Sequence, residues 1–212
     1  MSGLKFSRSR DFEILDLGRC EYEEANRKML SAVEERTRGA IPDRLLFCEF
    51  EPVVTVGRGG DPARYRRLGL PVIPVARGGK ATFHGPGQVV AYPILALEGK
   101  ARDLHAFLRA FEEALILTVG DFGLKGARDP RNTGCWVNGR KIASIGVAVR
   151  RWVTYHGVAL NVATDLAFFR RFDPCGLDPE LVTSMVRELK EPPSLDEVRS
   201  SLARRFQEVL RS

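Results

Sequence analysis

The sequence predicts an α+β fold, an α/β sandwich-like arrangement in which helices flank a mixed, largely antiparallel sheet. Short β-rich runs and amphipathic helical segments follow one another without the regular strand–helix alternation of a parallel sheet. Asn138-Gly139, between two such runs, supplies both positive-φ residues of a type I′ turn and predicts an antiparallel hairpin. The chain has no repeat, low-complexity stretch or linker, so residues 1–212 are expected to form a single domain.

The first predicted elements are a helix and two β-rich runs. Apolar residues recur at helical spacing over Tyr22–Arg38, and Gly39 follows, which predicts an amphipathic helix that stops at the glycine. Arg44–Phe50 and Val53–Val56 are β-rich and are separated by Pro52. This pattern favours a hairpin or a bent strand.

The middle of the chain predicts a short helix, two strands and a long helix. Asp61-Pro62 can begin the short helix as its cap and first-turn proline. Strands are expected over Val72–Ala76 and Gln88–Ile94. Apolar residues share one face over Asp103–Val119, which predicts a helix with Asp103 as its N-cap.

The last part of the chain predicts two further strands and a C-terminal helix. Strands are expected over Lys141–Arg150 and Trp152–Val162, with a polar corner at Arg150-Arg151 between them. Ser194-Leu-Asp-Glu197 has the pattern of a capping box, in which the serine and glutamate cap the first helical turn.

Composition and charge limit the classes of function. No run approaches the roughly 18 apolar residues of a membrane span. No apolar segment follows the basic N-terminal residues, so we expect no signal peptide, no membrane association and a cytoplasmic location. The net charge of +6 suits an acidic protein partner, although most basic clusters on proteins are solvated faces. We expect no nucleic-acid partner, because no helix-turn-helix, zinc-finger or RNA-recognition signature accompanies the charge.

The four cysteines are interpreted as free thiols. Cys20, Cys48, Cys135 and Cys175 have no CxxC spacing, so neither a disulfide framework nor a metal site is expected. Cys48 and Cys135 lie in apolar surroundings and are interpreted as structural. Cys175, in Pro174-Cys175-Gly176, is predicted to lie in a turn, where a thiol is more often accessible.

A glycine-rich stretch runs through Arg77-Gly-Gly-Lys-Ala-Thr-Phe-His84-Gly-Pro-Gly-Gln88. It leaves the backbone open to close approach, with Arg77 and Gln88 as flanking donors. The spacing fits neither the dinucleotide fingerprint nor the phosphate-binding P-loop. The glycines alone therefore leave open whether the stretch is a binding loop or a connection with tight turns.

Two strands carry further polar residues whose roles are open when each is taken singly. Lys141 lies on a strand with one apolar face, so its ammonium either extends to solvent or is a partly buried cation. His156 fits a hydrogen-bonded core position. Together, a thiol in a turn, a lysine on a buried strand and glycine-walled backbone donors are the components of acyl transfer through a thioester. The thiolate is the nucleophile, and a neighbouring ammonium favours it.

Four linked motifs resemble the lipoyl(octanoyl) transferases in order and spacing, over most of the chain. The motifs are Arg77-Gly-Gly-x-x-Thr82-Phe-His84-Gly-Pro-Gly-Gln88, Gly139-Arg-Lys141-Ile-Ala-Ser-Ile-Gly146, Thr154-Tyr-His156-Gly157-x-Ala-Leu-Asn161 and Pro174-Cys175-Gly176. The resemblance implies the fold of the biotin and lipoate protein ligases, one catalytic domain and no cofactor. It implies transfer of an octanoyl or lipoyl group from acyl carrier protein to a lysine of an acceptor. The acceptors would be lipoyl domains of 2-oxoacid dehydrogenase complexes and the glycine-cleavage H protein. We expect a monomer.

The resemblance also implies roles for individual residues. Cys175 would be the nucleophile that carries the acyl thioester, and Lys141 would lower the pKa of its thiol and later help to take a proton from the attacking amine. Other residues would surround the acyl chain and the thioester carbonyl: Arg77, Gly78, Gly79, Lys80, Ala81, Thr82, Phe83, His84, Ser144, Ile145, Gly146, Gly157, Val158 and Ala159. One departure from the family pattern is Cys135, where a residue without a thiol is expected.

Two alternative functions remain. An ATP-dependent lipoate or biotin protein ligase would share the glycine-rich stretch and Lys141. A ligase that works through an adenylate has no use for a thiol nucleophile, so the Cys175 motif favours the transferase. The second alternative is a non-catalytic module that binds carrier or lipoyl domains through its arginines.

Overall fold

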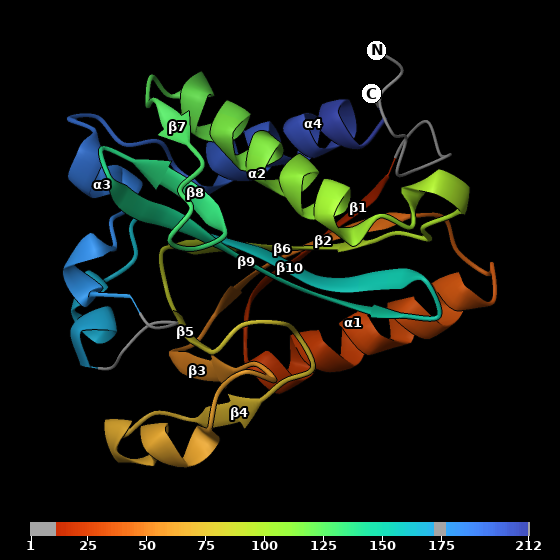
Figure 1. Cartoon of the computed structure of the whole chain (residues 1–212), viewed down its shortest axis with the longest axis horizontal. Helices are drawn as coiled ribbons and strands as arrows, with labels where there is room; N and C mark the ends of the chain where they lie inside the picture. The colour runs from red at the N-terminus through yellow and green to blue at the C-terminus, as the bar shows by residue number, and fades with distance from the viewer. Residues whose placement is uncertain (1–11, 172–176, 212) are drawn as a thin grey trace.

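The computed structural model describes residues 12–171 and 177–211, which form two sheets flanked by helices (Figure 1). The larger sheet has seven strands in the spatial order β1-β2-β6-β10-β9-β8-β7. Its strands β1 and β2 are parallel, and the other neighbouring strands of this sheet are antiparallel. The bounds are β1 (Glu13–Cys20), β2 (Arg44–Phe50), β6 (Gln88–Ile94), β7 (Gly126–Ala127), β8 (Gly134–Val137), β9 (Arg140–Arg150) and β10 (Val153–Asn161).

The smaller sheet has three strands in the order β4-β3-β5. Its strands are β3 (Val53–Val56), β4 (Val72–Pro74) and β5 (Ala81–His84). β3 is parallel to β4 and antiparallel to β5. This sheet lies at the bottom of the molecule in Figure 1, beside the end of α1.

Helices cover both faces of the larger sheet (Figure 1). α1 (Tyr22–Thr37) packs against β10, β6 and β2, while α2 (Leu104–Asp121) and α4 (Leu195–Arg211) pack together on the opposite face. None of the helices in the described part of the chain has the length and apolar character needed to cross a membrane. The shorter helical elements are α3 (Met185–Glu188), η1 (Pro62–Leu68), η2 (Gly99–Ala101), η3 (Leu166–Arg171) and η4 (Pro179–Leu181).

The helix signals in the sequence are confirmed. α1 buries the apolar stripe that its spacing predicts, from Tyr22 to Val33. Asp103 caps α2 by accepting hydrogen bonds from the backbone N–H groups of the next turn. At the start of α4, Ser194 and Glu197 form the predicted capping box, with each side chain bonded to the backbone N–H of the other.

Four parts of the chain differ from the predictions. β1 was not expected, because its exposed and half-buried residues show no alternation of apolar and polar positions. Of the hairpin and the bent strand expected around Pro52, the hairpin is wrong, since β3 pairs with β4 and β5 and the chain passes from one sheet to the other. The glycine-rich stretch contains a strand, β5. The turn between β9 and β10 is centred on Arg151 and Trp152, which both have positive φ.

β10 passes very close to β6 at Gly157. A Cβ atom at this position would overlap the carbonyl oxygen of Ala91 and lie 2.8 Å from Cδ of Pro93. Glycine therefore permits the antiparallel pairing of β10 with β6. The same residue lies opposite Gly146 of β9, so the close approach also fixes where β9 lies.

Gly157→Ala is expected to lower the free energy of unfolding by about 1–3 kcal/mol, the usual cost of overpacking a core. Gly120→Ala is a matched control, because a Cβ at Gly120 on α2 would meet nothing within 4 Å and alanine is the better helix former. Urea titration followed by circular dichroism measures both variants. Equal stability of Gly157→Ala and the wild type would contradict the close approach.

Candidate active site

A cavity of about 510 Å³ lies along β9 and β10. Its wall follows the ladder between the two strands, where Ser144 pairs with Ala159 and Gly146 with Gly157. The small side chains at these positions leave space above the sheet. Lys141 lies at one end of this row.

Most of the residues predicted around the acyl chain line this cavity. They are Arg77, Gly78, Gly79, Lys80, Thr82, His84, Ser144, Ile145, Gly146, Gly157, Val158 and Ala159, and the predicted catalytic residue Lys141 also lines the cavity. Ala81 and Phe83 do not line it. They alternate with Thr82 and His84 along β5, so their side chains point to the other face and join separate apolar clusters. Cys175 lies outside the described residues.

Lys141 is buried, with 5% of its surface exposed, so it does not extend to solvent as a lone lysine on a strand usually does. Its ammonium donates a hydrogen bond to the side-chain oxygen of Asn132. Asn132 in turn accepts a hydrogen bond at its backbone carbonyl from Nε1 of Trp136, at 3.0 Å. The guanidinium of Arg131 stacks over the same indole ring, 4.5 Å from its centroid. These contacts fix the loop before β8 against Lys141.

A chain of hydrogen bonds joins the glycine-rich stretch to the backbone of Lys141. The amide of Gln88 bonds to Nδ1 of His84 at 2.7 Å and to the side-chain oxygen of Asn161 at 2.9 Å. The amide nitrogen of Asn161 donates to the carbonyl of Thr183 at 3.0 Å. The N–H of Thr183 then donates to the carbonyl of Lys141 at 2.9 Å. The motifs recognised separately in the sequence are therefore physically connected.

Arg77 holds the loop that precedes β5. Its guanidinium donates to the carbonyls of Gly78 and Lys80, both at 3.0 Å, and to the carbonyl and hydroxyl oxygens of Thr55 at 2.8 and 2.9 Å. Its alkyl part lies over β9, where a Cβ at Gly146 would be 2.6 Å from Cδ of Arg77. Arg77 thus shapes the wall of the cavity and clamps the backbone around it.

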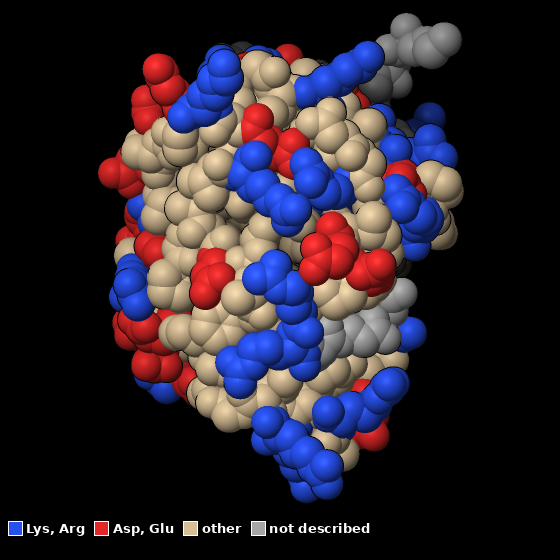
Figure 2. Space-filling view, turned by 90° about the vertical axis from the view of Figure 1, so that its left-hand side faces the viewer, with Lys and Arg blue, Asp and Glu red and all other residues tan. Residues whose placement is uncertain are grey.

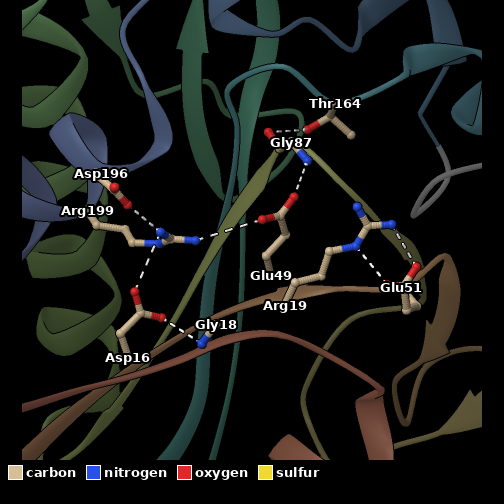
Figure 3. A network of polar contacts seen from close by, with 9 residues as sticks. All are labelled: Asp16, Gly18, Arg19, Glu49, Glu51, Gly87, Thr164, Asp196 and Arg199. Atoms are coloured by element: carbon tan, nitrogen blue, oxygen red, sulfur yellow. Dashed lines mark hydrogen bonds and ion pairs between the residues drawn. The ribbon is translucent and has the colours of Figure 1, made fainter.

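The turn between β5 and β6 is anchored from the other side by an ionic network (Figure 3). Glu49 of β2 accepts a hydrogen bond from the N–H of Gly87 at 2.8 Å. Arg199 of α4 lies 3.8 Å from the second oxygen of Glu49. The guanidinium also pairs with Asp196 at 2.6 Å and with Asp16 at 3.5 Å. A residue of the C-terminal helix therefore supports the turn beside the cavity.

The carbonyl of Gly87 completes this anchoring. It accepts hydrogen bonds from the N–H groups of Val162 and Ala163, at 3.1 and 2.8 Å, and from the hydroxyl of Thr164 at 3.1 Å. Gly87 has φ +80°, and a Cβ there would lie 2.5 Å from the backbone of Ala163. Only glycine meets both conditions at low cost.

Two buried histidines line the cavity and are neutral at physiological pH. Burial, with the Arg77 guanidinium nearby, lowers the pKa of His84 to about 4 and that of His156 to about 3. His156 has φ +55° in the middle of a strand, an uncommon conformation that His adopts more readily than most residues. The expected hydrogen-bonded core role is wrong for its ring, which makes only aromatic contacts within the described part of the chain.

The described cysteines are poor nucleophiles. Burial raises the pKa of the Cys135 thiol to about 12 and raises that of the Cys48 thiol well above its usual range. Burial also raises the pKa of Cys20. None of the three lines the cavity. Cys135 is buried in the apolar core, as its sequence surroundings indicate.

Sequence reasoning missed several residues of the site. Gly57 and Gly59, in the loop after β3, are two of them, and the glycine cluster in the sequence there could have indicated their role. Their N–H groups donate to the carbonyls of Lys80 and Gly79 at 2.9 and 3.0 Å. Asn132 and Tyr92 gave no such signal, because only the tertiary fold brings them to the cavity. No cluster of three or more His, Cys, Asp or Glu suited to a metal ion occurs within residues 12–171 and 177–211.

Comparison with known proteins agrees with this geometry. The lipoyl protein ligase A/B catalytic domain matches residues 21–207. Octanoyltransferases from Geobacter metallireducens and Rubrobacter xylanophilus are each 46% identical to the chain, over 193 and 202 residues. These alignments cover 91% of this chain in both cases, and 91% and 90% of the respective relatives.

Solved structures with a similar fold include a bi-partite lipoate protein ligase from Thermoplasma acidophilum and a biotin protein ligase from Aquifex aeolicus. The first has a TM-score of 0.73 at 21% identity and covers 94% of this chain and 84% of its own. The second has a TM-score of 0.55 at 9% identity, with 94% and 69% covered. At these identities the two similarities confirm the predicted ligase-like fold alone. The sequence relatives go further, and the chain belongs to the lipoyl protein ligase A/B catalytic domain family and, within it, to the octanoyltransferases, which are acyltransferases.

Proposed function

We propose that the chain transfers an octanoyl or lipoyl group from acyl carrier protein to a lysine of a lipoyl domain, through a thioester on Cys175. Octanoyl transfer in protein lipoylation is the activity of its family relatives. The observation that carries the proposal is the cavity of about 510 Å³ that has buried Lys141 at one end.

The cavity suits an aliphatic acyl chain. Val90, Val158 and Ile145 give it apolar walls, and glycine at Gly146 and Gly157 leaves the sheet surface open. Each methylene transferred from water to such surroundings contributes about 0.8 kcal/mol. An eight-carbon chain would therefore bind mainly through burial, with the carbonyl end toward Lys141.

Cys175 is the cysteine best suited to carry the acyl group. The thiols of Cys20, Cys48 and Cys135 have raised pKa values, and only the thiolate form of a cysteine is a good nucleophile. Leu177, two residues after Cys175 in the sequence, lines a small cavity together with Lys141. This proximity supports a Cys175–Lys141 pair.

The proposed reaction has two steps. Neither step requires ATP, because the acyl group of the donor is already activated as a thioester. In the first step the Cys175 thiolate attacks the donor carbonyl, a new C–S bond forms, and the carrier thiolate leaves with a proton from Lys141. In the second step the neutral amine of the acceptor lysine attacks the Cys175 thioester. An amide forms, the C–S bond breaks, and Lys141 takes the proton that the amine loses.

Basic side chains on one side of the molecule support the proposal that its protein partners are acidic. The elements η1, η3 and α3 lie on the left side of Figure 1, the side that faces the viewer in Figure 2, where Lys and Arg side chains gather in a broad band. Exposed basic residues on these elements are Arg64, Arg66, Arg67, Arg170, Arg171 and Arg187, and exposed Lys190 follows α3. Positive charge near the cavity would speed encounter with acidic partners, and salt would weaken this electrostatic attraction. Octanoyl-acyl carrier protein is the proposed donor, and lipoyl domains of 2-oxoacid dehydrogenase complexes and the glycine-cleavage H protein are the proposed acceptors.

We also propose that residues 1–212 act as one catalytic domain and as a monomer. The family match over residues 21–207 supports one domain, as does a sheet whose strands come from most of the chain.

Incubation with octanoyl-acyl carrier protein in the absence of ATP is expected to add the mass of one octanoyl group to the wild type. Hydroxylamine should remove it, because a thioester is labile to this reagent. Cys175→Ala should show no adduct and no transfer, whereas Cys135→Ala, which removes a buried thiol outside the cavity, should keep the adduct. Intact-mass spectrometry measures all three proteins.

Two results would contradict this route. An adduct of normal yield on Cys175→Ala would exclude Cys175 as the nucleophile. Acylation of a lipoyl domain that required octanoate and ATP, with no adduct from the carrier-bound donor, would assign the chain a ligase activity instead.

Asn132→Ala is expected to lower kcat for transfer roughly 10- to 100-fold, which corresponds to the loss of one hydrogen bond to a charged group. Asn132 contacts Lys141 and is a positioning residue. Asn132→Asp should recover part of the rate, because it restores the acceptor oxygen, and should move the alkaline limb of the pH–rate profile upward, because a carboxylate favours the ammonium form.

The control for this prediction is Asp129→Asn in the same loop, where the Asp129 carboxylate pairs with exposed Arg131. It should leave the pH–rate profile unchanged. Asn132→Ala and Asn132→Asp with equal rates and the wild-type pH profile would show that the contact with Lys141 has no part in the reaction.

A further inference from the structure

Two side-chain hydroxyl groups from different sheets lie at the same part of the cavity wall as Lys141. Thr82 belongs to β5 of the smaller sheet, and Ser144 belongs to β9 of the larger one. Both residues line the large cavity along β9 and β10, and both also line the small cavity that Leu177 borders, as Lys141 does. Among the described residues, these three are common to both cavities. They therefore mark the place where the two cavities adjoin.

A β-bulge in β9 allows Ser144 to line the same cavity as Lys141. On a regular strand, residues three positions apart face opposite sides of the sheet. The register between β8 and β9 shifts just after Lys141, which leaves Ile142 as an extra residue of β9 in this step. Ile142 and Ala143 are both buried in the apolar core. Lys141 and Ser144, on either side of this pair, both line the cavity instead.

The neighbours of Thr82 fix the direction of its side chain. Ala81 and Phe83 face away from the cavity into separate apolar clusters, so Thr82 between them faces the cavity. Arg77 holds the chain at the start of this strand by donating to the carbonyl of Lys80 at 3.0 Å. The buried Thr82 hydroxyl is thus presented to the cavity by a strand that is fixed in place.

Both hydroxyls have hydrogen-bonding capacity left for a bound molecule. Neither makes a hydrogen bond with another residue in the described part of the chain. By contrast, the side-chain amide of Asn161, which lines the small cavity, bonds to Gln88 and to the carbonyl of Thr183. The ammonium of Lys141 donates to Asn132. A hydroxyl that faces a cavity without a protein partner can donate to an oxygen atom of a bound molecule.

We propose that the hydroxyls of Thr82 and Ser144 donate hydrogen bonds to the carbonyl oxygen of the acyl group, which makes both of them catalytic residues. This role rests on the proposed function, because it takes the thioester carbonyl to lie beside Lys141 in the cavity. The substrate group that the two hydroxyls recognise is the carbonyl of a thioester.

The reason for such donors is the charge that develops on the carbonyl oxygen. In each step of the proposed reaction a nucleophile adds to the carbonyl carbon, and an electron pair of the C=O double bond moves to oxygen. The pair returns when the C–S bond to the leaving group breaks, and the leaving sulfur takes the electrons of that bond. Donors already in place at the oxygen stabilise this charge strongly where water is excluded. A hydroxyl keeps its own proton, whereas Lys141 exchanges protons in both steps.

Thr82→Val keeps the branched shape of the side chain and removes the hydroxyl. It is expected to lower kcat for octanoyl transfer roughly 10- to 100-fold, with KM changed less than about threefold, because the bond is strongest in the transition state. Ser144→Ala should act in the same direction, and Thr82→Ser should recover part of the rate. The matched control is Thr118→Val, since the Thr118 hydroxyl bonds within α2 and does not line the cavity. It should keep the wild-type kcat.

Infrared difference spectroscopy of the acyl-enzyme reads the contact itself. The acyl-enzyme is formed from octanoyl-acyl carrier protein with and without ¹³C at the carbonyl, in the absence of acceptor. Loss of a hydrogen bond should move the thioester carbonyl band to higher frequency in Thr82→Val and Ser144→Ala, but not in Thr118→Val. Ser144→Ala decides the matter if Thr82→Val does not fold.

Binding of octanamide, measured by isothermal titration calorimetry, tests the same contact without any reaction. Its carbonyl oxygen accepts hydrogen bonds, so removal of either hydroxyl should weaken binding about tenfold. An unshifted carbonyl band and unchanged octanamide binding in the folded variants would overturn the role of the two hydroxyls. A wild type that forms no acyl-enzyme would refute the proposed function, while octanamide binding would still decide whether Thr82 and Ser144 hold a carbonyl.

Discussion

The hydrogen bonds of the Gln88 side-chain amide are the interactions on which the site depends most. Its oxygen and nitrogen bond to His84 and Asn161, and Asn161 continues through Thr183 to the backbone of Lys141. An amide suits this position because it can donate and accept at the same time, which neither a carboxylate nor an ammonium can do. The network is buried, so each bond is worth more than it would be in water and each missing partner would be costly.

Glycine determines the shape around this network. Gly157 lets β10 approach β6, Gly146 makes room for the alkyl part of Arg77, and Gly87 brings the turn against the end of β10. In each case a side chain would collide with backbone or with a clamped side chain. The glycine-rich motif is therefore a packing requirement as much as a binding surface. Polar clamps and absent side chains together create a cavity that is rigid on the sheet side.

Local signals in the sequence predicted the elements that depend on neighbouring residues. The apolar face of α1, the Asp103 cap, the Ser194–Glu197 capping box and the Asn138-Gly139 turn all appear as expected. Elements that depend on distant partners were missed or misread. β1 has little apolar pattern and is held by pairing with β2. β2 and β3 are neighbours in the sequence but join different sheets, and this choice depends on the distant strands with which each one pairs.

The same division applies to the site. Motifs located Lys141 and most of the cavity wall, because a resemblance carries information about distant contacts that periodicity lacks. Ala81 and Phe83 fell within a motif but face away, since a strand presents alternate residues to opposite sides. Asn132 and Tyr92 reach the cavity from a loop and from the neighbouring strand β6, and no local pattern marks them.

The support of the Gly87 turn by Arg199 has a consequence for how the molecule assembles. Glu49 and Gly87 come from the first half of the chain, whereas Arg199 lies on α4, after every other helix and strand. Contacts between residues far apart in sequence close large loops and form slowly. During synthesis from the N-terminus, α4 is also the last element to become available. The wall of the cavity thus reaches its final geometry late in folding, and a chain whose sheet has already formed still lacks a finished cavity until its C-terminal helix has docked.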